Sequence, residues 1–257
     1  MRSREPGRSR KNSARRFAAG GIDGVHLVWT DASTVTVQVG ECRDSTDSYD
    51  MELTSTQAVA IGSSGAAGLD TGSESSGTAT WYYVYLIAGD AGTSAVFSTN
   101  ASAPTLPTGY QYYRRIGAVM NWTDNDIQKF TMTGKGRTRT TWWNELPANF
   151  QKALDNGVSN GSWAEVSVAN FVSPKASEMY LRATASAGTT NNNRVKAKDY
   201  SPAGASGTNT TQMIVAQNYN AYNVMWLLCD TDKAFEHYAD NSACRLTVSI
   251  RAYREIL

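Results

Sequence analysis

The order of apolar and polar positions along the chain favours short β-strands. Residues 81–87 read Trp-Tyr-Tyr-Val-Tyr-Leu-Ile, an unbroken run of aromatic and aliphatic types between Gly77 and Gly89. The run is too short for a globular helix, so it predicts a buried central strand. A Gly-Asp-Ala-Gly turn at 89–92 and a return strand at 95–98 should follow, and residues 110–119 are expected to re-enter the same sheet.

Strict alternation marks other strands. Residues 25–29 and 34–39 alternate on either side of a short polar turn, which predicts a β-hairpin. Residues 127–133 alternate in the same way. Near the C-terminus, apolar residues recur at every second position from 246 to 252, with Tyr253 in the polar series. The last strand is therefore expected to bury one face and to leave Tyr253 on the other.

The second half of the chain reads as a series of strands joined by Gly-, Ser- and Asn-rich connections. The predicted strands are 163–172, 178–185, 194–198, 212–217, 224–229 and 246–253. This spacing favours an antiparallel β-sandwich of the jelly-roll kind. Between the halves, Pro147 marks a boundary, and residues 148–156 have helix-forming composition before Gly157, which predicts a short linking helix.

These patterns predict an all-β protein with two antiparallel β-sandwich or jelly-roll-like domains after an extended basic arm. The expected boundaries are 1–20 for the arm, 21–146 for the N-terminal domain and 147–257 for the C-terminal domain. A chain of 257 residues is long enough to bury two such cores. No apolar run approaches the roughly 18 residues of a membrane helix, and no secretory signal is recognisable, so we expect no membrane insertion and assembly in a cytoplasm.

The formal charge is strongly asymmetric. Residues 1–17 hold seven basic side chains and one acidic one, a net charge of +6, whereas the remainder carries −5. The basic residues are Arg2, Arg4, Arg8, Arg10, Lys11, Arg15 and Arg16. A like-charge block without apolar periodicity is typical of an extended arm that docks on a partner subunit. Nucleic-acid binding is the alternative, but it is not favoured because no aromatic residue precedes Phe17.

One segment carries a resemblance. Leu-Asp-Thr-Gly-Ser at 69–73, the run at 81–87, Pro-Thr-Leu-Pro-Thr-Gly-Tyr at 104–110 and Arg-Arg-Ile-Gly at 114–117 occur in that order. This order resembles a module of tailed-bacteriophage and prophage virion proteins of the fibre-like type, and it spans about 50 of the 257 residues. The resemblance implies a β-rich, commonly trimeric structural or attachment protein of the virion. It implies neither an enzyme nor a cofactor.

Two adjacent tryptophans are the main candidate contact residues. Trp142 and Trp143 follow Arg137 and Arg139 in a predicted strand. Neighbouring residues of a strand point to opposite faces. The favoured interpretation is that one ring fills the core and the other covers the seam between the two domains. The alternative is that the paired tryptophans, beside the two arginines, form a surface for a stacked saccharide or a neighbouring subunit.

The sequence offers little for catalysis or metal binding. His26 and His237 are the only histidines, and neither has a partner at metal-ligand spacing, so no metal site is predicted. We interpret the carboxylates around His237 as a solvated turn. Cys42, Cys229 and Cys244 have no CxxC spacing, so free thiols are favoured, although Cys229 and Cys244 could meet across a hairpin.

Three functions are consistent with these features. The first is a homotrimeric virion fibre or spike subunit that docks on other virion proteins through its N-terminus and binds host-surface glycans. The alternative is a capsid decoration, or cement, protein that stabilises the head. The third, a virion-associated glycan-cleaving enzyme, would need two carboxylates roughly 5–10 Å apart, and no pair stands out. We therefore predict a non-enzymatic virion protein without a cofactor.

Overall fold

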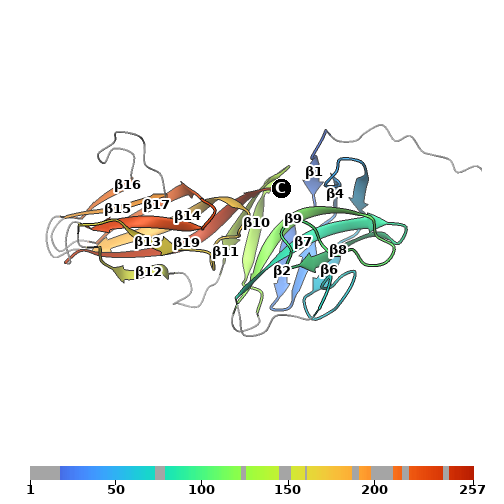
Figure 1. The fold of residues 1–257 in the computed structure, drawn as a ribbon, viewed down its shortest axis with the longest axis horizontal. Coiled ribbons are helices and arrows are strands. Elements are labelled where there is room, and N and C mark those ends of the chain that lie inside the picture. Colours follow the sequence, from blue (N-terminus) through green and yellow to red (C-terminus); the bar gives the residue numbers. More distant parts are fainter. Residues whose placement is uncertain are drawn as a thin grey trace, which may run out of the picture.

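The structure is a computed structural model that describes residues 18–72, 79–122, 126–144, 152–159, 161–186, 191–197, 211–215, 220–239 and 243–257. Every regular element in these ranges is a β-strand, and all the strand pairs run antiparallel. The predicted all-β class is confirmed. The molecule is elongated, with most strands of the first half in one lobe and those of the second half in the other (Figure 1).

The largest sheet contains strands from both halves of the chain. They are β2 (Leu27–Asp31), β3 (Thr34–Val37), β6 (Gln57–Ala60), β10 (Phe130–Lys135), β11 (Thr138–Trp143), β12 (Lys152–Gly157), β14 (Ala176–Ser186), β17 (Asn220–Leu228) and β19 (Arg245–Ile256). The order is β17-β14-β19-β11-β10-β2-β3-β6, and β12 pairs separately with β19. This sheet is continuous across the boundary expected near residue 147. The division into two jelly-roll-like domains stays a prediction.

Three smaller sheets complete the structure. The first, of order β1-β4-β5, contains β1 (Ile22–Gly24), β4 (Gly40–Arg43) and β5 (Asp50–Leu53). The second, of order β8-β7-β9, contains β7 (Thr80–Gly89), β8 (Gly92–Ser98) and β9 (Tyr112–Asn121). The third, of order β13-β18-β15-β16, contains β13 (Ala164–Ser167), β15 (Asn191–Ala197), β16 (Thr211–Val215) and β18 (Ala234–Ala239).

Strand β7 is the buried central strand that the run at 81–87 predicts. Its two faces enter two different apolar clusters, one shared with the large sheet and one beneath the segment that leads to β9. The side chains are Tyr82, Val84 and Leu86 on the first face and Tyr83, Tyr85 and Ile87 on the second. Because both faces are covered, the strand needs no polar positions, which explains the absence of alternation.

Strand β19 is buried by alternation until a bulge changes its phase. Leu246, Val248 and Ile250 face inward as predicted. The prediction for Tyr253 is wrong, because this residue is fully buried. Tyr180 of β14 pairs with Ala252 and the next residue of β14 pairs with Ile250, so one extra residue of β19 is inserted at this point. A bulge places two residues opposite one, and the positions beyond it exchange faces.

The predicted helix at 148–156 is wrong where it falls on described residues. Residues 152–157 form β12, which pairs with β19 through irregular register shifts. Leu154 of this strand packs against the main core. Helix propensity is a weak preference, and pairing with the free edge of a long strand supplies backbone hydrogen bonds that override it.

The turn interpreted around His237 is also a strand. Residues 234–239 form β18, in which Phe235, His237 and Ala239 are buried while Glu236 points outward to an ion pair with Lys196 (N–O distance 2.6 Å). The outward positions are Glu236 and Tyr238, and the aromatic Tyr238 among them obscures a clean alternation of apolar and polar residues. Strand β18 pairs with β13 on one side and with β15 on the other, and these backbone hydrogen bonds account for the strand.

Candidate binding site on the outer face of the large sheet

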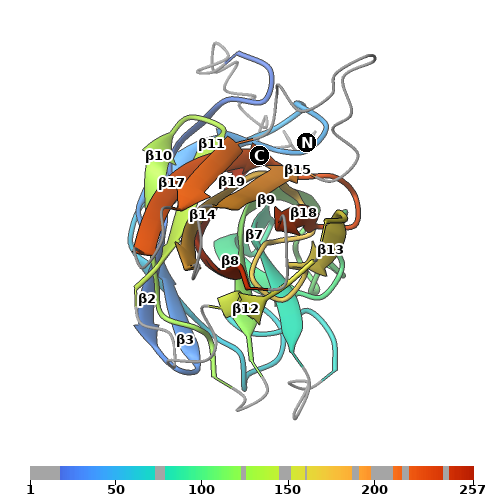
Figure 2. The same cartoon turned by 90° about the vertical axis from the view of Figure 1, so that its left-hand side faces the viewer.

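Four adjacent strands bring three aromatic rings into one row. Trp142 of β11 lies opposite Ala252 of β19, Ala252 lies opposite Tyr180 of β14, and Tyr180 lies opposite Trp226 of β17. The strands can be followed in Figure 2. Because Ala252 is small, the rings beside it lean together, and the centroids of Trp142 and Tyr180 are only 5.4 Å apart. The rings of Tyr180 and Trp226 are 5.1 Å apart.

A hollow of about 510 Å³ opens beside these rings. We call it the aromatic hollow, and it is lined by Trp142, Trp143, Asn144, Tyr180, Arg182, Val224 and Arg251. Arg182 follows Tyr180 on the same face of β14, and Arg251 is the extra residue of the β19 bulge. The described residues of the lining therefore combine aromatic rings with two guanidinium groups and one amide.

Polar contacts hold the rings in place. The guanidinium group of Arg254 lies over the Trp226 ring at 4.2 Å from its centroid and forms an ion pair with Glu178. Trp142 donates its indole N–H to the hydroxyl of Thr133 at 3.2 Å. Because these contacts restrict the ring orientations before any ligand is present, the aromatic hollow is preorganised.

The two adjacent tryptophans have different environments, as expected. Trp143 is 6% exposed, its ring centroid lies 5.7 Å from that of Tyr253, and its indole N–H donates to the carbonyl of Phe171. Trp142 is half-buried on the outer face. Figure 1 locates β11 where the two lobes meet.

The arginines that the sequence associates with these rings are located elsewhere. Arg139 is 1% exposed and donates to the carbonyls of Gly136 and Gly24. Odd-numbered residues of β11 face inward, so Arg139 shares the side of Trp143, and burial lowers its pKa. Arg137 lies in the preceding turn and donates to the carbonyl of Leu257. The predicted grouping of both arginines at one surface with Trp142 is therefore wrong.

The remaining candidates, the basic residues of the arm, lie outside the described residues. Sequence reasoning missed the residues from the second half of the chain, which are Tyr180, Arg182, Val224, Trp226, Arg251 and Arg254. A partial signal was present in 178–182, because Glu178, Tyr180 and Arg182 are aromatic or charged at every second residue. Their convergence depends on strand pairing, which the local pattern does not contain.

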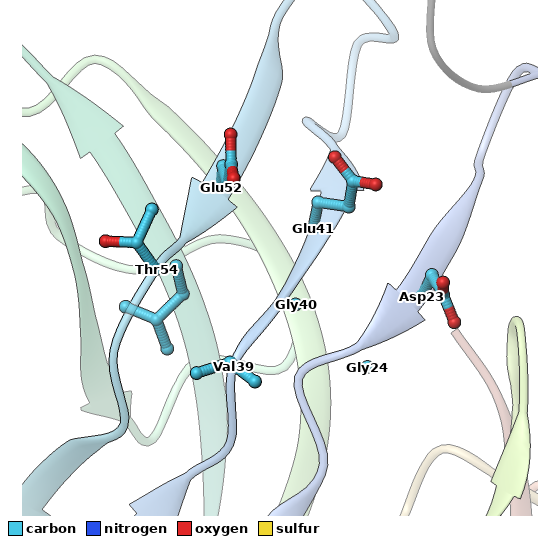
Figure 3. A pocket seen from close by; sticks show the side chains of 8 residues that line it. Asp23, Gly24, Val39, Gly40, Glu41, Glu52 and Thr54 are labelled. Atoms are coloured by element: carbon cyan, nitrogen blue, oxygen red, sulfur yellow. The ribbon is translucent and has the colours of Figure 1, made fainter.

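A second depression lies on the small N-terminal sheet. Figure 3 shows Asp23, Glu41 and Glu52 on three neighbouring strands. The register places Asp23 opposite Glu41 and Glu41 opposite Glu52, and the depression has a volume of about 430 Å³. Within the described ranges, however, no group of three or more His, Cys, Asp or Glu side chains is arranged to bind a metal ion. The depression is a negatively charged surface without an assigned ligand.

Buried ionisable groups serve the structure. Glu255 is 1% exposed, pairs with Arg115 at 2.9 Å and accepts a hydrogen bond from the Ser173 hydroxyl at 2.6 Å. These contacts link β9 and β19 at the junction of the two lobes. All three cysteines are free thiols, and burial raises the pKa of Cys42 and Cys229 to about 12, so neither is an activated nucleophile.

Comparison with models of known protein families finds no match, and no curated protein matches the sequence significantly. The resemblance to fibre-like virion proteins therefore stays a prediction. None of the described segments is a helix long and apolar enough to cross a membrane.

Proposed function

We propose that this chain is a binding and assembly protein whose aromatic hollow holds a saccharide. The observation that carries the proposal is the pair of Trp142 and Tyr180, whose rings line an open hollow together with hydrogen-bonding side chains. Apolar sites with a few well-placed polar groups are typical of small-ligand recognition. Pyranose rings have an apolar face for aromatic contact and peripheral hydroxyls for hydrogen bonds.

The proposed setting is a fibre or spike subunit of a tailed bacteriophage, assembled as a homotrimer. The fibre-like order of motifs within 69–117 supports it, as does the +6 arm, which suits docking on an acidic partner surface. The elongated shape is consistent with this arrangement, because β1 lies in one lobe whereas β14 and β17 lie in the other (Figure 1). Docking and saccharide binding would then use different parts of the molecule.

Capsid decoration is the second candidate, and the charge asymmetry supports it. A basic arm could lie across neighbouring capsid subunits, and the β-rich body would then form a surface knob. Glycan cleavage is not favoured at the aromatic hollow, because none of the described residues that line it is a carboxylate and the usual mechanism needs two.

A binding experiment tests the saccharide proposal. The full chain is applied to a microarray of bacterial surface glycans, together with Trp142→Ala and with Trp163→Ala, in which the removed ring belongs to the opposite sheet and lies against Tyr238. We expect the parent and Trp163→Ala to bind the same glycans and Trp142→Ala to lose most of the signal. Equal signals from all three proteins, or no binding by any of them, would reject the proposal.

Particle labelling tests the setting. A gold-tagged copy is located on intact particles by electron microscopy, and a variant lacking residues 1–17 is tested for incorporation. Label at the tail tip or fibres supports a fibre subunit, whereas label over the head shell supports decoration. Unaltered incorporation of the truncated chain would contradict docking through the arm.

A further inference from the structure

We propose that the open edge of β17 pairs with the same edge of a second copy of this chain, so that two large sheets join into one across a two-fold axis. This inference goes beyond the proposed function and does not depend on saccharide binding. It rests on the direction of the backbone hydrogen bonds, on two exposed apolar side chains and on the uncharged composition of the strand.

Strand β17 is the last strand of the large sheet. Among the described strands, β14 alone pairs with it, and Figure 2 shows β17 beside β14 on the side away from β19. The strand has nine residues. At the other end of the sheet, β6 has only four residues, and Ala60 donates its N–H to the carbonyl of Ala67 at 3.0 Å. One end of the sheet is therefore short and partly covered by a loop, whereas the other is long and open.

Two hydrogen bonds show which backbone groups of β17 point away from β14. Cys229, directly after the strand, donates its N–H to the carbonyl of Ser177 in β14 at 2.9 Å. Val224 instead donates its N–H to the side chain of Asn223 at 2.8 Å. In an antiparallel pair, alternate residues bond to the partner strand. Odd-numbered residues of β17 therefore bond to β14, and the even-numbered residues from 224 to 228 direct their N–H and C=O groups to the open edge.

The composition of β17 lacks the residues that commonly protect an edge. Charged side chains, above all lysine, and proline keep natural edge strands from pairing with other chains. Residues 220–228 contain neither a charged residue nor a proline. Val224 and Leu228, which are apolar, are 46% and 60% exposed. An edge with these properties favours pairing with another strand.

A second copy fits this edge because the strand is complementary to itself. When two copies pair antiparallel with Trp226 opposite Trp226, Val224 of each copy lies opposite Leu228 of the other. In this register the outward residues form hydrogen-bonded pairs, and each pair exchanges two N–H···O=C bonds. Val224 exchanges the amide oxygen of Asn223 for a carbonyl of the second copy. The exposed apolar side chains of the two copies then cover each other.

The charge and the ring positions support the same partner. Like charges opposite each other destabilise a pair of strands, and a strand without charged residues brings none to its own copy. The Trp226 ring lies 5.1 Å from the ring of Tyr180, and the guanidinium group of Arg254 lies over it. Because Tyr180 and Arg254 belong to β14 and β19, they hold the ring over its own sheet and not over the edge.

Pairing also affects how the aromatic hollows are presented. A two-fold axis between antiparallel strands is perpendicular to the sheet, so the outer faces of both copies point the same way. Under the proposed function, on which this consequence rests, the pair presents two saccharide sites to one surface. Two linked sites raise the apparent affinity for a repeated glycan without any new contact.

Sedimentation velocity of the full chain between about 1 and 100 μM tests the contact, because an interface made by one strand is small and associates weakly. We expect the parent to reach twice the mass of Leu228→Lys, in which a charge at the edge weakens association at least about tenfold. Ile256→Lys is the matched control. Ile256 is 57% exposed, but β19 has neighbouring strands on both sides, so this variant should associate as the parent does. Thermal unfolding verifies that both variants fold.

Cross-linking tests the register. A Val224→Cys chain and a Leu228→Cys chain, both also carrying Cys229→Ser, are mixed, treated with a short bismaleimide and analysed by mass spectrometry. The proposed register places the two new thiols on opposite residues, whose Cα atoms are about 5.5 Å apart. Two copies of position 224 are roughly 13 Å apart along the strands. We therefore expect linked chains in the mixture and few in either chain alone.

The outcomes separate this inference from the proposed function. A parent that has the same mass as Leu228→Lys at every concentration overturns the pairing. An equal loss of association in Ile256→Lys also overturns it, as does a linked product that either cysteine chain forms alone as efficiently as the mixture. The glycan array decides the proposed function separately, because Leu228 is not among the described residues that line the aromatic hollow.

Discussion

The two faces of the large sheet use similar residues for different purposes. Trp142 and Trp143 are neighbours in β11, and Arg254 and Glu255 are neighbours in β19. The inner members are 6% and 1% exposed, and their polar atoms contact Phe171, Arg115 and Ser173. The outer members are more exposed: Trp142 lines the aromatic hollow, as the edge of Trp143 also does, and Arg254 lies over the ring of Trp226. A tryptophan or a charged residue therefore acquires its role from the face it occupies, because burial requires polar atoms to be paired within the protein.

The opposite surface of the C-terminal lobe also combines aromatic rings with basic side chains. The ammonium group of Lys196 lies over the Trp163 ring at 4.7 Å, and the guanidinium group of Arg194 lies over the Tyr238 ring at 5.2 Å. Lys196 also pairs with Glu236. Here the cations cover the rings and a carboxylate neutralises one of them. Arg254 covers the ring of Trp226 in the same way, whereas Trp142 and Tyr180 border a hollow that leaves space for a ligand.

The largest expected effect is the loss of the inner tryptophan. Trp143→Ala should lower the free energy of unfolding by about 3–5 kcal/mol, because it leaves a cavity against Trp81 and Tyr253 and removes a buried hydrogen bond. Urea titration followed by circular dichroism measures the change. Trp142→Ala is the matched variant and should cost only about 1 kcal/mol, through the lost ring contact with Tyr180. Equal losses would contradict the difference between the two faces.

The carboxylates of Glu255 and Glu178 are also expected to differ in how much they contribute to the free energy of unfolding. Glu255→Gln removes the charge that compensates half-buried Arg115 and should destabilise the fold by about 3 kcal/mol, because the ion pair lies on the buried side of β19. Glu178→Gln breaks an ion pair on the outer face and should cost less than about 1 kcal/mol. The same urea titration compares the two variants. A loss in Glu178→Gln as large as that in Glu255→Gln would show that the outer pair is structural.

Arg254 is expected to affect binding more than stability. Arg254→Gln removes the guanidinium group from the Trp226 ring and should cost about 0.5–1 kcal/mol of stability. Because the ring is then less restrained, saccharide affinity should fall several-fold. Calorimetry with the glycan selected on the array measures the change. An unchanged affinity would mean that the restraint on Trp226 has no part in recognition.

The smallest effect is a pH dependence from His237, which lies on the buried face of β18. His237 is 3% exposed, and burial lowers its pKa below the ordinary value of 6.5. Buried neutral His237 therefore contributes its full share to the stability of the fold above pH 6.5. This contribution is lost as the pH falls toward the lowered pKa, because His237 of the unfolded chain binds a proton at a higher pH than His237 of the folded chain. The loss should be at most about 0.7 kcal/mol between pH 7 and pH 6.

Urea titrations of the parent and of His237→Gln at both pH values measure this contribution. The substitution should reduce the acid-induced loss, whereas His26→Gln, on the outer face where the ring contacts the carbonyl of Gly134, should retain it. An identical loss in the parent and in His237→Gln would assign the pH dependence to other groups.

The amino-acid sequence by itself determined the all-β class, the buried strand at 81–87 and the hairpin from 25 to 39. It also predicted that Trp142 and Trp143 face opposite ways. These features depend on residues a few positions apart, because backbone preference and period-two alternation are local properties.

Only the tertiary structure decided which distant segments meet. Residues 152–157 became a strand because the edge of β19 was available for pairing, and Tyr253 turned inward because a bulge shifted its phase. The row formed by Trp142, Tyr180 and Trp226 depends on the order of four strands separated in sequence. Strand order and register follow from non-local hydrogen bonds and shared burial, which no local pattern of residues specifies.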